Sequence, residues 1–80
     1  MKVRSYGKLA DVLGPERCLD IGAPCTIAEL RARLAAECPE AAEPLASKRV
    51  RACVGEEIVS DSHVVHPGET LELLAPVSGG

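Results

Sequence analysis

Apolar and polar residues alternate over three short stretches of the chain, and this pattern is typical of strands with one buried face. The stretches are residues 2–6, 17–21 and 70–74. In the second of them, Leu19 and Ile21 fall on the same side. We therefore predict three strands that each turn one face toward a common core.

Two other stretches repeat their apolar residues at helical spacing. Leu9, Val12 and Leu13 predict a short helix that closes at Gly14-Pro15. The clearest helix is predicted from about Thr26 to Cys38, where Thr26 and Glu29 match a capping box. Its apolar stripe consists of Ile27, Leu30, Leu34 and Cys38. We expect Leu30, at the centre of this stripe, to be fully buried.

The remaining segments complete an α+β pattern. Residues 50–54 and 58–59 flank Gly55, which predicts a β-hairpin. Residues 40–47 are interpreted as a loop with a helical turn, and residues 61–66 as a connector. We expect a mixed sheet of four to five strands with one main helix and short extra helices across it.

Composition restricts the chain to one modest domain. Its 80 residues are 46% hydrophobic, and Tyr6 is the single aromatic residue, so Leu, Val, Ile and Ala must form the core. No apolar run approaches the roughly 20 residues that span a bilayer, and the N-terminus lacks a signal-peptide pattern. A cytoplasmic protein without a membrane partner is the simplest expectation.

Charge is unevenly distributed along the chain, whose net charge is −3. Acidic and basic residues balance at six each up to residue 40, whereas six acids face three basic residues afterwards. This distribution argues against nucleic-acid binding, which requires a basic surface. It suits a basic protein partner.

Side chains that could carry catalysis are sparse. Four cysteines, Cys18, Cys25, Cys38 and Cys53, include no C-x-x-C pair and are interpreted as reduced, mostly structural thiols. His63 and His66 are interpreted as solvated loop residues rather than metal ligands. With no phosphate-binding motif and no nucleophile paired with a base, the chain is expected to be bound or acted upon.

The last five residues, 76–80, have no bulky side chain beyond Val77. Pro76 would direct them away from the preceding strand, and Gly79-Gly80 form the thinnest possible peptide. We therefore divide the chain into a domain of residues 1–75 and a flexible Gly-Gly tail of residues 76–80. Such a tail could thread a narrow channel and bring its carboxylate to a reactive group on another protein.

The ending from Gly68 to Gly80, with its acidic turn, strand and Pro-Val-Ser-Gly-Gly, resembles that of MoaD proteins. These are the small sulfur-carrier subunits of molybdopterin synthase, within the ThiS/MoaD ubiquitin-like family. Residues 1–3 with 6–9 resemble this family's opening strand and short helix, residues 26–31 its helix start, and residues 54–60 its central hairpin. The likeness covers nearly the whole chain in order.

The resemblance implies a ubiquitin-like β-grasp fold and a role as the non-catalytic small subunit of an enzyme complex. An E1-like adenylyltransferase of MoeB type would adenylate Gly80 with its own ATP and magnesium, and a persulfide protein would supply the sulfur. The resulting thiocarboxylate would donate sulfur to cyclic pyranopterin monophosphate inside a large subunit of MoaE type. This chain itself would bind no cofactor. Its inserted arm would be Pro76, Val77, Ser78, Gly79 and Gly80.

The surface that meets these partners is predicted at the end of the last strand. Because strand residues alternate, only one of Leu73 and Leu74 can enter the core and the other must point outward. We assign Leu74 to the partner surface. With Glu69 and Glu72 at its rim, Leu74 would anchor a partner with an apolar groove and a basic edge.

Other roles share the same ending. A ubiquitin-like protein modifier would join Gly80 to lysines of other proteins, and sulfur carriers serve other pathways such as thiamine synthesis and tRNA thiolation. A β-grasp binding module would not use its last two residues at all.

Overall fold

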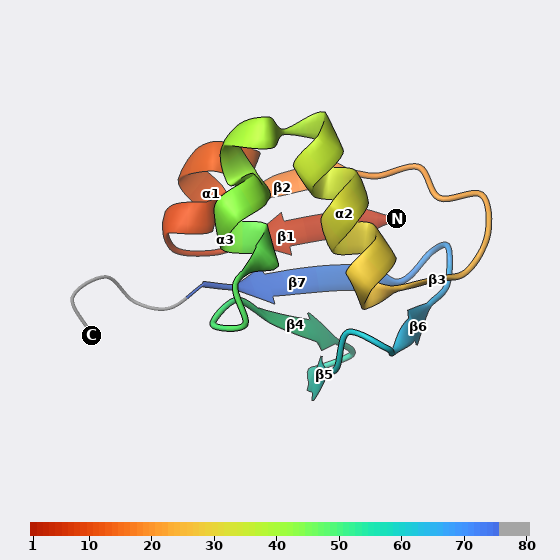
Figure 1. Cartoon of the computed structure of the whole chain (residues 1–80). Helices are drawn as coiled ribbons and strands as arrows, with labels where there is room; N and C mark the ends of the chain where they lie inside the picture. The colour runs from red at the N-terminus through yellow and green to blue at the C-terminus, as the bar shows by residue number, and fades with distance from the viewer. Residues whose placement is uncertain (76–80) are drawn as a thin grey trace.

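The computed structural model describes residues 1–75 and arranges them in two layers. The helices all lie on one side of the main sheet (Figure 1). In chain order the elements are β1 (Lys2–Ser5), α1 (Lys8–Leu13), β2 (Glu16–Cys18), β3 (Cys25–Thr26), α2 (Ile27–Glu37), the 3-10 helix η1 (Pro39–Ala41), α3 (Ala42–Ala46), β4 (Arg51–Val54), β5 (Glu57–Val59), β6 (Val64–Val65) and β7 (Thr70–Leu74).

The main sheet has five strands in the order β2-β1-β7-β4-β5. Its two central neighbours, β1 and β7, run parallel, with Val3 opposite Leu71 and Ser5 opposite Leu73. The other neighbouring pairs are antiparallel. A mixed sheet whose first and last strands pair in parallel, with α2 packed across it, is the ubiquitin-like β-grasp fold that the resemblance implied.

The core lies between α2 and the helix-facing side of the two central strands. Val3, Leu30, Leu34, Leu71 and Leu73 are all fully buried. The expected burial of Leu30 is therefore confirmed. Removing side chains of this size from water supplies most of the stability of a small domain, at about 1.5–3 kcal/mol for each fully buried residue.

Helix α2 begins where the capping box predicted. Thr26 accepts a hydrogen bond from the backbone N–H of Glu29 at 3.2 Å, and Glu29 accepts one from the backbone N–H of Thr26 at 3.1 Å. The hydrogen bonds from the Thr26 backbone and hydroxyl stabilise the carboxylate and lower the pKa of Glu29. The first turn is thus held by both members of the motif.

The hairpin of β4 and β5 turns at Gly55 as predicted. Val54 pairs with Glu57, so the turn consists of Gly55 and Glu56, which have positive φ angles of 58° and 70°. Two positive φ angles define the type I′ turn, whose twist matches that of the flanking strands.

Four segments differ from the prediction, and two of them are the second strand and residues 40–47. The second strand is β2, shorter and shifted to Glu16–Cys18, although Leu19 and Ile21 are buried as expected. Residues 40–47 are mostly helical in η1 and α3, because Ala41 and Leu45 reach the core from one side of these turns. The alanines in this segment made the spacing of Ala41 and Leu45 hard to recognise in the sequence.

The expected loop before α2 and the expected connector of residues 61–66 pair with each other. Cys25 lies opposite Val65, and Thr26 lies opposite Val64, in a separate two-stranded sheet of β3 and β6. Each strand has two residues, too few for an alternation pattern to be recognised.

Candidate functional site

The strand that leads to the tail is at the centre of the sheet. β7 lies between β1 and β4 and ends at Leu74, with Ala75 as the last described residue. The predicted arm, Pro76, Val77, Ser78, Gly79 and Gly80, lies outside the described residues. Pairing on both sides holds the base of this arm rigidly, because β7 cannot move without breaking two strand ladders.

The two leucines at the end of β7 face opposite sides. Leu73 is fully buried, whereas 37% of Leu74 is exposed. The alternation predicted from the sequence is therefore observed, and Leu74 lies on the face of the sheet away from the helices. On this face Leu74 is opposite Arg51 of β4.

Glu72 lies on the same face of β7 and is bound by the chain's single tyrosine. The Tyr6 hydroxyl donates a hydrogen bond of 2.6 Å to Glu72 Oε2. This bond holds the proton on the phenol, and together with the nearby carboxylate charge it raises the pKa of Tyr6 above 10.0. Parallel pairing of Ser5 with Leu73 places the following residue, Tyr6, alongside Leu74.

Glu69 does not border Leu74. It precedes β7 at the other end, where its carboxylate accepts a 2.7 Å hydrogen bond from the backbone N–H of His66. The acidic rim expected around Leu74 therefore contains Glu72 but not Glu69. Glu69 and Leu74 are close in the sequence but far apart in space, because the five residues of β7 extend about 17 Å.

A second apolar side chain continues the open face beyond Glu72. In register with Glu72 lie Cys53 of β4 and then Ile58 of β5. Ile58 is 63% exposed, while Cys53 is buried between its neighbours. We call Tyr6, Leu74 and Ile58, with Glu72 between them, the open-face patch.

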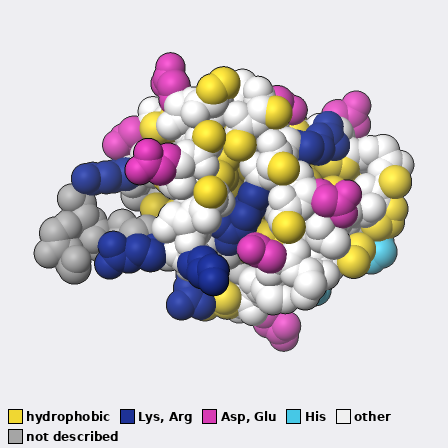
Figure 2. Space-filling view, viewed as in Figure 1, with side chains coloured by type: hydrophobic (Ala, Val, Ile, Leu, Met, Phe, Trp, Pro, Cys, Tyr) yellow, Lys and Arg dark blue, Asp and Glu magenta, His cyan; other side chains and the backbone are white. Residues whose placement is uncertain are grey.

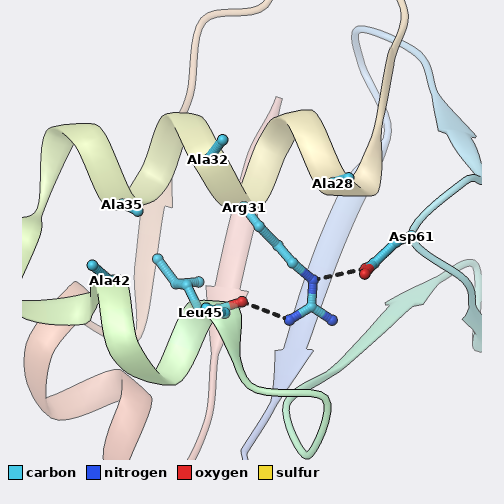
Figure 3. Close-up of a pocket in the computed structure, with 8 residues that line it drawn as sticks. Ala28, Arg31, Ala32, Ala35, Ala42, Leu45 and Asp61 are labelled. Atoms are coloured by element: carbon cyan, nitrogen blue, oxygen red, sulfur yellow. Dashed lines mark hydrogen bonds and ion pairs between the residues drawn. The ribbon is translucent and has the colours of Figure 1, made fainter.

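Arg31, which the sequence analysis did not single out, organises the segment that leads into β4. Its guanidinium donates to the carbonyl oxygens of Leu45 at 2.8 Å, Ser47 at 3.3 Å and Val50 at 2.6 Å. Figure 3 shows the side chain reaching from α2 across to the C-terminal end of α3. One cation thus binds three carbonyl groups between α3 and β4, and the Ser47 carbonyl also accepts a 3.2 Å hydrogen bond from the backbone N–H of Val50.

An ion pair completes the surroundings of Arg31. Its Nε lies 2.9 Å from Asp61 Oδ1, although this nitrogen is not aligned for a hydrogen bond. The Arg31 side chain is only 14% exposed, compared with 61% for Asp61. The three carbonyl contacts therefore contribute most of the binding, because the exposed carboxylate is screened by water. The sequence did contain one signal that could have identified Arg31, namely an arginine at the half-buried edge of a predicted helix.

Other candidate chemistry stays limited in the described part of the chain. All four cysteines are free thiols, of which Cys18 is exposed and Cys53 is buried. Within residues 1–75, no three His, Cys, Asp or Glu side chains gather closely enough to hold a metal ion. Among the same residues, no helix has the length and apolar character of a bilayer span.

Comparison with known proteins agrees with this architecture. The model of the ThiS family matches residues 3–80, so the chain belongs to the ThiS family of the ThiS/MoaD ubiquitin-like group. No curated protein sequence matches the chain.

Among solved structures, the chain is similar to SAMP1 from Haloferax volcanii, with a TM-score of 0.86 at 20% identity over 99% of this chain and 97% of that one. A second crystal structure, of H. volcanii small archaeal modifier protein 1, gives a TM-score of 0.83 at 17% identity over 95% of both chains. At these identities the likeness establishes the fold.

Proposed function

We propose that this protein is a sulfur carrier whose C-terminal Gly80 is activated as an acyl adenylate and converted to a thiocarboxylate. The observation that carries the proposal is the extent of the family match, which runs through Gly79 and Gly80. The Gly-Gly ending is therefore part of the family pattern.

The chemistry would belong to the partners. A carboxylate is a poor electrophile, so an E1-like adenylyltransferase of MoeB type would join the Gly80 carboxylate to the α-phosphate of ATP and release pyrophosphate. The terminal sulfur of a persulfide protein would then attack the acyl carbon and displace AMP, which gives an acyl disulfide. A second thiol of the donor system would cleave its S–S bond, leaving the thiocarboxylate on Gly80 and a disulfide between the two thiols. The role of this chain is to present the tail from a rigid central strand, with the open-face patch beside it for docking.

The specific pathway that we favour is molybdopterin synthesis. In that case the thiocarboxylate would enter a large subunit of MoaE type and donate sulfur to cyclic pyranopterin monophosphate. The resemblance of residues 68–80 to MoaD endings supports this choice.

The second candidate is a ubiquitin-like protein modifier, and the similarity to a small archaeal modifier protein supports it. Both functions begin with adenylation of Gly80, so they differ only in the group that attacks the acyl carbon. A tagged copy in cells distinguishes them on denaturing gels: a ladder of conjugates supports the modifier. A discrete native complex with a MoaE-type subunit supports the carrier.

Intact mass spectrometry tests the sulfur-carrier proposal. The protein is incubated with an E1-like adenylyltransferase, ATP, magnesium and a persulfide donor. We expect a mass gain that matches exchange of one oxygen for sulfur, and no gain after deletion of Gly80 or in Gly79→Leu, because a side chain there blocks a narrow channel. Both variants should melt at the wild-type temperature. An unmodified wild-type mass, under conditions that convert a known carrier, would overturn the proposal.

A further inference from the structure

The nine Lys and Arg side chains divide into two groups. Within residues 1–75, five of them bind a carboxylate or a carbonyl oxygen, namely Lys2, Arg4, Arg17, Arg31 and Arg33. The side chains of the other four have no such partner in that part of the chain: Lys8, Lys48, Arg49 and Arg51. We call these four the basic collar.

The basic collar lies at the end of the molecule where β7 stops. Lys8 begins α1, and Arg51 begins β4 opposite Leu74. Lys48 and Arg49 occupy the turn that leads into β4. Figure 2 shows dark-blue side chains gathered at this end, on the left of the view. A chain with net charge −3 thus carries a local positive surface around the end of β7.

A groove of about 380 Å³ opens between two members of the collar, Lys8 and Arg49, and Ala75 is part of its wall. Its apolar lining comes from Leu9, Val12, Pro44 and Val50. Leu9 and Val50 are buried, whereas Lys8 and Arg49 are exposed, so the charges lie at the rim and the hydrocarbon at the floor. Glu43 adds one carboxylate to the rim.

The distance from Ala75 to Gly80 limits how far a reacting partner can stay from this end of the domain. Gly80 is five residues after Ala75, and fully extended these residues reach at most about 18 Å. If Gly80 reacts inside another protein, as the proposed function requires, the surface of that protein must come against the residues around Ala75. The groove and the basic collar then fall within the interface.

We propose that this groove is the docking site for an acidic segment of the protein that activates the tail. The segment places an apolar side chain between Val12 and Pro44, and its carboxylates face Lys8 and Arg49. Charge complementarity selects this occupant, because the two cations at the rim have no carboxylate partner within residues 1–75 and so attract acidic groups and raise the rate of encounter. The inference rests on the proposed function and adds the chemistry of the partner surface.

Pyrophosphate exchange measures the interaction directly. The probe is an E1-like adenylyltransferase from the same organism, assayed for ATP–pyrophosphate exchange at increasing concentrations of the carrier. In the double variant Lys8→Glu, Arg49→Glu we expect KM to rise about tenfold or more at low salt, with little change in kcat. The difference should shrink as ionic strength rises, because exposed charges are screened.

Two further variants separate docking from loss of structure. Glu43→Gln removes the groove's own carboxylate and should lower KM, an opposite shift that general destabilisation cannot produce. Lys2→Glu, Arg33→Glu carries the same charge change away from the groove and should leave KM within about twofold of wild type. Circular dichroism melting confirms that each variant is folded.

The outcomes are distinct. If Lys8→Glu, Arg49→Glu changes neither KM nor its salt dependence, the groove is not the docking site. Exchange with wild-type protein would still support the proposed function in that case. A lower KM in that variant would assign the groove to the chain's own tail, held by the two cations in the free protein, and would also overturn the proposal. No exchange with wild-type protein would overturn both.

Discussion

The two faces of the central strands differ in what they contribute. On the face toward α2, Leu71 and Leu73 are fully buried against hydrocarbon. On the other face, Glu72 and Leu74 of the same strand stay partly accessible beside Tyr6. One strand therefore serves stability with alternate residues and leaves the residues between them open to contact from outside the domain. Substitutions on the two faces should have separable effects.

The largest change in stability is expected at the buried face. Leu30→Ala should lower the free energy of unfolding by about 2–5 kcal/mol, because it leaves a cavity under α2 where no solvent reaches. Chemical denaturation measures this difference.

Leu74→Ser is the matched change on the open face. Since Leu74 is already 37% exposed, its loss should cost below about 1 kcal/mol. In the pyrophosphate-exchange assay the same variant should raise KM about fivefold. Equal losses of stability in Leu30→Ala and Leu74→Ser would contradict the claim that the buried face contributes more stability than the open face.

Substitutions at Arg31 test whether one polar side chain contributes as much to the free energy of unfolding as a residue of the apolar core. Arg31→Met keeps the length of the side chain but removes the guanidinium donor from the carbonyls of Leu45, Ser47 and Val50. Of these carbonyls, within residues 1–75, only that of Ser47 accepts another hydrogen bond outside helices and strands, from the backbone N–H of Val50. We expect a loss of about 2–3 kcal/mol. Asp61→Asn, which weakens only the exposed ion pair, should cost below about 1 kcal/mol. Equal losses would show that the ion pair, and not the carbonyl contacts, stabilises this segment.

The smallest effect is a shift in titration on the open face. Because the hydrogen bond to Glu72 raises the pKa of Tyr6, ultraviolet absorbance should show the folded protein ionising above 10.0. The stabilisation from this bond is present below the unfolded pKa and is lost as pH rises through the folded one. In Glu72→Gln the titration should move back toward 10.0. With one tyrosine and no tryptophan, the signal has a single source.

Local patterns predicted the elements that have enough residues to show a period. The capping box and stripe of α2, the alternation of β7 and the turn at Gly55 are all observed. The β3–β6 pair was missed because each strand has two residues. The helix α3 was missed because its five residues include Pro44 and only one large apolar side chain, Leu45. Contacts from elsewhere in the chain stabilise both.

The candidate site was predictable only in part for the same reason. Alternation alone indicates that Leu73 and Leu74 face opposite sides, since that property belongs to one strand. The hydrogen bond between Tyr6 and Glu72 joins residues 66 positions apart, and only the parallel pairing of β1 with β7 brings them together.

The sequence by itself determined the period, and hence the buried side, of each longer element, because side-chain direction along a helix or strand follows from backbone geometry. Only the tertiary structure decided which charges lie around the end of β7, where the tail begins. By sequence position the tail belongs to the acidic half of the chain, yet Lys8 comes from the other half and Arg51 lies opposite Leu74. Electrostatic attraction depends on distance in space, and strand pairing sets that distance independently of separation along the chain.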